Sequence, residues 1–161
     1  MPRWAYDPGR HRAPDREPLD AAKNLVPSRF AGFVPADNAA FRYGLTLNDG
    51  GFFWEAHEVW EAVWKAAPMN GRDRLALQAL IQIANAGLKQ RQARPRAAAR
   101  LIDHATTLLD ELTGRGIASE PESIAGRLQA GWLREELACG TIPGRIRLGR
   151  FFSGEKMKEN A

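Results

Sequence analysis

The sequence predicts an all-α fold, a compact bundle of about four to five helices preceded by an extended, proline-rich N-terminal arm. Three observations lead to this prediction. Apolar residues recur at helical spacing through most of the chain, and no segment alternates like a strand for long. The connections between the helical segments are short, which favours antiparallel neighbours in a bundle. With 161 residues, the chain is long enough to bury a core and is expected to form one helical domain.

The predicted arm covers residues 1–36, which carry six of the ten prolines and show little periodicity. Its aromatic residues can pack it against the helices: Trp4, Tyr6, Phe30 and Phe33. The first helix is expected to begin after Asp37, which can act as its N-cap, and to run to about Asn48. Gly50 and Gly51 then break the chain.

Proline and glycine residues limit the later helices. The expected ranges are 52–66, 73–91, 95–112 and 121–138. Pro68 ends the first of these helices, Pro95 suits the first turn of the third, and Gly114 stops it. Residues 140–161 are expected to form an irregular, basic C-terminal tail, which leaves residues 37–139 as the helical bundle itself.

Composition excludes several classes of protein. The single cysteine, Cys139, cannot form an intrachain disulfide and favours a reducing compartment. No apolar stretch approaches the length of a membrane span, and the N-terminus lacks the apolar run of a signal peptide. The sequence therefore predicts a cytoplasmic protein that does not enter a membrane.

A formal net charge of +4 permits a polyanionic partner. The arginines form two groups: Arg91, Arg94, Arg96 and Arg100, then Arg145, Arg147 and Arg150. Either group could contact phosphates, but no nucleic-acid-binding motif accompanies them, so a solvated basic face is favoured over nucleic-acid binding.

Residues 50–64, GGFFWEAHEVWEAVW, combine three of the five tryptophans with a histidine set among carboxylates. One apolar stripe at helical spacing should face the core: Phe52, Ala56, Val59 and Val63. His57 lies at the edge of this stripe and shares a helical face with Glu61, so the two side chains can hydrogen-bond or jointly hold a ligand. Glu55 and Glu58 point away from the stripe.

Trp54 lies off the apolar stripe, where it either lines a pocket beside His57 or is covered by the arm. The predicted helix 73–91 is apolar over most of its circumference, as is typical of a buried helix. Four polar residues nevertheless form one narrow stripe along it: Gln78, Gln82, Asn85 and Lys89. Because an unsatisfied buried polar group costs about 1–3 kcal/mol, we expect this stripe to contact the His57/Glu61 pair.

Imidazole with carboxylates can bind zinc, manganese or iron, or transfer protons. The sequence HEVWE begins like the metalloprotease motif HExxH, but Glu61 stands where that motif has its second histidine. A metal site would therefore need His57, Glu58 or Glu61, and a distant ligand. In the structural alternative, His57 hydrogen-bonds across two helices and holds them together, and Glu61 partly balances its charge.

FFWEAHEVWEAVW, followed by LQALIQIANAGLKQ and PRAAARLIDHA, resembles the domain-of-unknown-function 309 family of small bacterial and archaeal proteins, over about residues 41–112. The resemblance implies a compact helical bundle and a predicted metal-dependent hydrolase, for which a divalent metal is the cofactor. The family pattern falls on these positions: Glu55, His57, Glu58, Glu61, Trp64, Gln78 and Gln82.

The chain departs from the family pattern at Lys89, where that pattern has a histidine, and at Ala93-Arg94, where it has a Gly-Asn pair. An ammonium group binds no metal unless it is deprotonated. Lys89 therefore weakens the metal hypothesis and is better interpreted as an ion-pair partner of Glu58 or Glu61.

Two functions follow from these patterns. The favoured one is a binding or structural module with a His/Glu/Gln/Lys polar site between two core helices, which could hold a small anionic ligand near Lys89 and the arginines. The alternative is a metal-dependent hydrolase in which His57 is a ligand or general base, and Glu58 and Glu61 are further ligands or acids. A homo-oligomer is compatible with either function.

Overall fold

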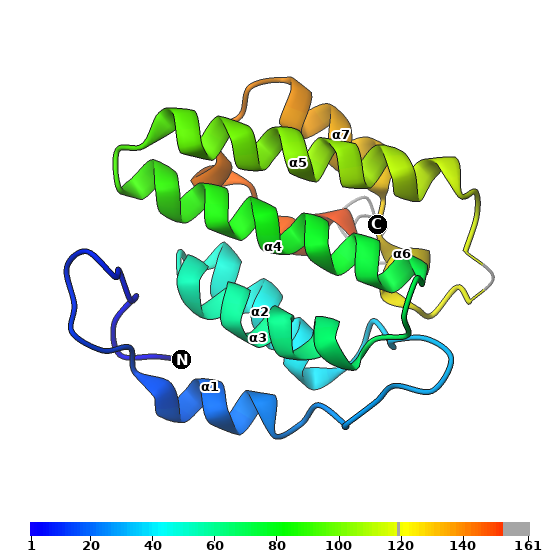
Figure 1. The fold of residues 1–161 in the computed structure, drawn as a ribbon, viewed down its shortest axis with the longest axis horizontal. Coiled ribbons are helices and arrows are strands. Elements are labelled where there is room, and N and C mark those ends of the chain that lie inside the picture. Colours follow the sequence, from blue (N-terminus) through cyan, green and yellow to red (C-terminus); the bar gives the residue numbers. More distant parts are fainter. Residues whose placement is uncertain (119, 153–161) are drawn as a thin grey trace, which may run out of the picture.

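Helices and the loops that join them make up the structure, a computed structural model that describes residues 1–118 and 120–152 (Figure 1). The α-helices are α1 (Arg16–Lys23), α2 (Ala39–Asp49), α3 (Phe53–Ala66), α4 (Arg72–Arg91), α5 (Pro95–Gly114), α6 (Ile124–Arg127) and α7 (Ala130–Ala138). Two 3₁₀-helices follow, η1 (Pro143–Arg145) and η2 (Leu148–Phe151). The all-α prediction is confirmed, since the described residues form isolated β-bridges but no strand.

The helix count is higher than predicted. Within residues 1–36, the short segment REPLDAAK forms α1, which buries Leu19 and Ala22 against the bundle. The N-cap of α2 is Asn38 rather than the predicted Asp37, because the Asn38 side chain accepts a hydrogen bond from the Phe41 N–H at 3.0 Å.

The predicted helix 121–138 is divided into α6 and α7. The chain leaves the helical conformation at Leu128, whose ψ is 125°. There it pairs with the C-terminal segment: the Gln129 N–H donates to the Phe151 carbonyl at 2.6 Å, and Leu128 forms a β-bridge with Phe152. This long-range pairing replaces the helical hydrogen bonds that the sequence alone predicts, and it brings Phe151 and Phe152 into the core.

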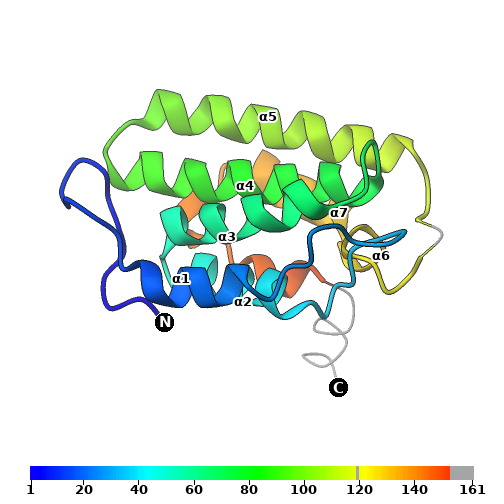
Figure 2. The same ribbon diagram turned by 60° about the horizontal axis from the view of Figure 1, so that its bottom comes forward.

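Helix α4 lies at the centre of the bundle. It packs against α5 on one side and α3 on the other, and α2 packs against α3 (Figures 1 and 2). This central position explains why α4 is apolar over most of its circumference, because its leucines and isoleucine face neighbours on several sides: Leu75, Leu77, Leu80 and Ile83. None of the helices in the described part of the chain is long and apolar enough to span a membrane.

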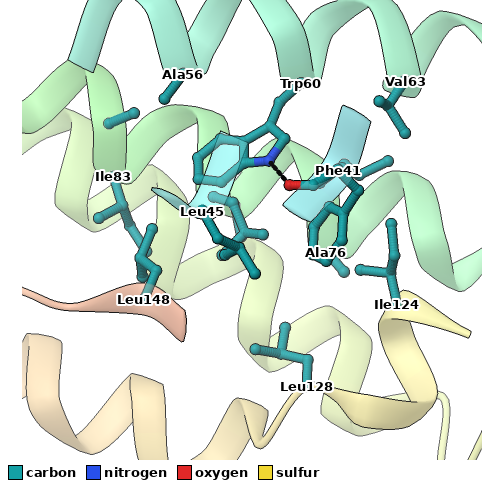
Figure 3. Close-up of a cluster of buried hydrophobic side chains, with 14 of the residues drawn as sticks. Phe41, Leu45, Ala56, Trp60, Val63, Ala76, Ile83, Ile124, Leu128 and Leu148 are labelled. Carbon is teal, nitrogen blue, oxygen red and sulfur yellow. Dashed lines mark hydrogen bonds between the residues drawn. The ribbon is translucent and has the colours of Figure 1, made fainter. Parts of the chain in front are cut away.

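Trp60 occupies the middle of the core and is fully buried (Figure 3). Its indole Nε1 donates a hydrogen bond to the Phe41 carbonyl at 3.1 Å, which satisfies the only polar atom of the side chain. The ring lies directly over Gly44 of α2, where an added Cβ atom would come 2.1 Å from Nε1. Gly44 is therefore required for α2 and α3 to approach this closely.

Asp73 joins three parts of the chain. Its buried carboxylate accepts hydrogen bonds from the Val34 N–H at 2.7 Å and from the Ala125 N–H at 2.9 Å. Burial raises the pKa of Asp73, and the two backbone hydrogen bonds oppose that shift. The segment before α2 and the start of α6 are thus both held at the N-terminal end of α4.

Replacement of Gly44 by alanine is expected to destabilise the protein by about 1–3 kcal/mol, because the new methyl group overlaps the Trp60 ring in a packed core. Gly131→Ala in α7 is the matched control, since its Cβ meets nothing within 4 Å. The control should be neutral or stabilising by up to about 1 kcal/mol, as helix propensity alone dictates. Urea denaturation of both variants measures the difference, and equal effects would contradict the packing described.

Candidate functional site

His57, Glu58 and Glu61 lie on the outer side of α3, where each contacts another polar side chain near the surface. His57 Nε2 lies 3.1 Å from Glu61 Oε2, and the other oxygen of Glu61 lies 3.3 Å from Lys65 Nζ. Glu58 Oε2 lies 3.2 Å from Nζ of Lys23 in α1. These side chains are partly exposed, so each pair contributes at most about 1 kcal/mol to stability.

Helices α3 and α4 pack together as predicted, but their polar residues do not meet. Within the described residues, no hydrogen bond or ion pair joins His57 or Glu61 to the stripe along α4, whose members are all half-buried: Gln78, Gln82, Asn85 and Lys89. The expected contact between the His57/Glu61 pair and the α4 stripe was therefore wrong. The expected ion pair of Lys89 was also wrong, because Glu58 pairs with Lys23 and Glu61 pairs with Lys65.

The register of the two helices explains why Lys89 is not a partner of the His57/Glu61 pair. Phe53, at the start of α3, packs against Gly87, near the end of α4. Glu61 follows Phe53 by eight residues, which places it about 12 Å further along the helix axis. Lys89 is therefore level with the start of α3 and not with the His57/Glu61 pair.

The residues around His57 do not fit a metal site. The described residues contain no group of three or more His, Cys, Asp or Glu side chains that could hold an ion. A catalytic zinc site takes three protein ligands, whereas His57, Glu58 and Glu61 are each already engaged with another side chain. His57 Nδ1 is buried and has no hydrogen-bond partner within the described chain.

Glu55 differs from the other glutamates of α3 because it is fully buried, with 0% exposure. Its Oε2 accepts a hydrogen bond from the Tyr6 N–H at 2.6 Å, while Oε1 has no partner among the described residues. Burial raises the pKa of Glu55, and the Tyr6 hydrogen bond opposes that shift. The pKa of Tyr43 is likewise raised by burial and by the charge of Glu55, and its hydroxyl is also unpartnered. A buried carboxyl and a phenol thus lie beneath the N-terminal segment.

The segment that covers Glu55 is held at several points along residues 3–15. Arg3 Nε lies 3.2 Å from Asp15 Oδ2, and the Tyr6 ring packs edge-on against Trp54 with centroids 4.7 Å apart. Trp54 was expected either to line a pocket beside His57 or to be covered by the N-terminal arm. The structure shows that the N-terminal segment covers it. Further along, Gln92 Nε2 donates to Asp7 Oδ1 at 2.9 Å. This last contact connects the segment to the residue that follows α4.

A cavity of about 620 Å³ lies beside that connection, between residues 7–10 and 88–94. In Figures 1 and 2 the N-terminal loop and the α4–α5 turn lie at the same end of the bundle. Four cationic side chains line the cavity: Arg10, Lys89, Arg91 and Arg94. Asp7 is the only acidic residue among the described residues that line it, and the hydrogen bond from Gln92 lowers the pKa of this carboxyl. The cavity, named the basic cleft below, therefore has a net positive charge.

A tight turn at the end of α4 brings Lys89 and Arg94 together. The Arg94 N–H donates to the Lys89 carbonyl at 2.9 Å and the Ala93 N–H to the Gln90 carbonyl at 3.0 Å, which is the hydrogen-bond pattern of a Schellman helix end. Ala93 adopts the left-handed conformation that this motif requires, with φ of 57°. This conformation costs a non-glycine residue about 1–2 kcal/mol. The turn brings Arg94 back beside Lys89.

Arg91 is held in place more firmly than the other cations. Its Nη2 donates to the Gly51 carbonyl at 2.6 Å, and the guanidinium carbon lies 4.5 Å from the centre of the Phe53 ring. The sequence identified Lys89, Arg91 and Arg94 as neighbours of a potential anion. It did not identify Arg10 or Asp7, because only the folded N-terminal segment brings residues 7–10 to this position.

Residues 41–101 match the model of the family described as Domain of unknown function (DUF309), which confirms the resemblance over this part of the chain. The matched region extends from α2 into α5 and includes both the His57 face and three cations of the basic cleft. Arg10 lies outside it. No curated protein and no solved structure matches the chain.

The buried Glu55 predicts a specific dependence of stability on pH. Because its pKa is raised above the ordinary 4.5 in the folded protein, the native state binds this proton more tightly than the unfolded chain does. The resulting stabilisation is fully present below the unfolded pKa and is lost as pH rises through the folded pKa. In Glu55→Gln the side chain is neutral throughout, so the stability of the wild type relative to this variant should fall as pH rises above 4.5.

Urea denaturation of both proteins between about pH 4 and pH 8 measures this relative stability. Glu135→Gln in α7 is the control, because Glu135 is exposed and its side chain makes no hydrogen bond or ion pair within the described chain. A difference between wild type and Glu55→Gln that is constant, or that grows with pH, would contradict the account of Glu55.

Proposed function

We propose that this protein is a binding module that holds a small anionic ligand in the basic cleft. The observation that supports this proposal most directly is the set of four cations around one cavity: Arg10, Lys89, Arg91 and Arg94. Cations confined together repel one another, and an anion in the cleft removes that cost. The cleft volume of about 620 Å³ is in the range of small-molecule sites.

The state of the individual side chains supports the same function. Lys89 and Arg94 make no ion pair or side-chain hydrogen bond with any described residue, so their charges are available to a ligand. Asp7 Oδ1 already accepts hydrogen bonds from Gln92 and from the Gly9 N–H, at 2.9 Å in both cases. Its Oδ2 lies 3.8 Å from Arg10 Nε, so Asp7 offsets part of the charge of Arg10 alone. Guanidinium groups bind phosphate through paired N–H donors. We therefore infer that the anion is a phosphate group.

The metal-dependent hydrolase is the alternative, with His57 and Glu58 or Glu61 as the reactive groups. It has less support, because these side chains are engaged in ion pairs and no third ligand lies with them among the described residues. We also infer that the protein is cytoplasmic. The exposed free thiol of Cys139 suits a reducing compartment.

Inorganic phosphate provides the direct test of the proposed function. Thermal unfolding of the full chain is measured with increasing phosphate, while sodium chloride holds the ionic strength constant. Phosphate should stabilise the wild type, by about 1.4 kcal/mol when its concentration is tenfold above Kd. In the double variant Lys89→Gln/Arg94→Gln this stabilisation should be lost, because the cleft keeps two of its four cations.

Arg96→Gln/Arg100→Gln is the matched control, since it removes the same charge from exposed positions of α5 outside the cleft. The control should respond to phosphate like the wild type. The absence of any phosphate effect on the wild type would overturn the proposal. An equal loss in both double variants would also overturn it, because binding would then depend on net charge alone.

A further inference from the structure

A second cavity, of about 330 Å³, lies against the other side of Arg91. It is formed by the α2–α3 turn, the end of α4 and the segment around η1. Its charged and amide side chains are Asp49, Gln90, Arg91, Arg145 and Arg147. Arg91 is thus shared by both cavities, and the second one is named the arginine pocket below.

The packing around Phe53 fixes the boundary between the two cavities. The Phe53 ring lies against the backbone of Gly87 and Gly144, where an added Cβ would approach it to 3.0 Å and 3.3 Å. The Arg91 guanidinium covers the ring and is hydrogen-bonded to the Gly51 carbonyl. A guanidinium has five N–H donors, so this single bond leaves donors for a ligand.

The arginine pocket is also positively charged. Within the described part of the chain, Asp49 is the one acidic residue that lines it, and its two oxygens accept the Leu148 N–H at 2.7 Å and the Gly149 N–H at 3.0 Å. Asp49 therefore holds the start of η2. Arg145 makes no ion pair or side-chain hydrogen bond with a described residue, and Arg147 donates only to the Gly144 carbonyl, at 3.5 Å.

Gln90 gives the arginine pocket a different chemistry from the basic cleft. The Oε1 atom of Gln90 is buried and accepts no hydrogen bond from the part of the chain that is described. A buried acceptor without a donor is unfavourable. A hydroxyl or N–H group on a ligand in this pocket would remove that cost once the Gln90 amide turns its Oε1 toward the pocket.

We propose that the basic cleft and the arginine pocket together bind one small molecule that carries two phosphate groups and a hydroxyl or N–H donor. One phosphate lies among Lys89, Arg91 and Arg94, and the second among Arg91, Arg145 and Arg147, while the donor reaches Gln90. This inference rests on the proposed function, since it uses the same cleft for the first phosphate. Sugar bisphosphates and nucleosides with two phosphate groups both have this chemistry.

Calorimetric titration of the full chain tests the two-phosphate site. The probes are inorganic phosphate, fructose 1,6-bisphosphate and adenosine 3′,5′-bisphosphate, at constant ionic strength. At least one bisphosphate should bind about tenfold or more tightly than phosphate, which corresponds to about 1.4 kcal/mol. The bisphosphate that binds more tightly identifies the source as a sugar or a nucleoside.

Variants of the arginine pocket locate the second phosphate. Arg145→Gln/Arg147→Gln should bring the bisphosphate affinity down to that of phosphate, while phosphate still binds in the basic cleft. Gln90→Leu should weaken the bisphosphate severalfold without affecting phosphate. The control Arg96→Gln/Arg100→Gln removes two arginines outside both cavities and should bind all three probes like the wild type.

The outcomes separate this inference from the proposed function. If phosphate itself does not bind, the proposed function fails and this inference fails with it. If phosphate binds but neither bisphosphate binds more tightly, or if the gain survives in Arg145→Gln/Arg147→Gln, only the two-phosphate site is overturned. Tighter binding of a short single-stranded oligonucleotide than of either bisphosphate would also overturn it, in favour of a nucleic-acid partner.

Discussion

The contact of Phe53 with Gly87 determines how α3 lies against α4, and the candidate site depends on it. The ring comes so close to the α4 backbone that a Cβ atom at position 87 would lie only 3.0 Å away. This packing places the end of α4 beside the Gly50–Gly51 turn, where Arg91 reaches the Gly51 carbonyl. Because Arg91 lines both cavities, their common boundary is a consequence of the core packing.

Local sequence signals were enough to predict four of the helices closely. Prolines, glycines and apolar periodicity gave the limits of α2 to α5 to within a few residues, since these helices begin and end for local reasons. The break between α6 and α7 could not be predicted in this way, because it depends on pairing with Phe151 and Phe152, more than twenty residues away. Helix α1 was missed because the segment has only eight residues and itself contains Pro18.

The residues of the basic cleft also divide into those that local sequence predicts and those that depend on the fold. Lys89, Arg91 and Arg94 are close in sequence, so a possible anion site at this turn was visible without the structure. Arg10 joins them only because the N-terminal segment is held by Tyr6 on Glu55 and by Asp7 on Gln92. The structure places Lys89 in the basic cleft, away from His57. A cation at this position suits an anionic ligand and does not suit a metal.

The most direct test of the binding site is to map it on the intact chain. Two-dimensional amide NMR spectra recorded during titration with inorganic phosphate report which backbone N–H groups sense the ligand. The account predicts that the largest changes occur at residues 7–10 and 88–94, on both walls of the basic cleft. Changes confined to the His57 face of α3, or no saturable change at all, would contradict it.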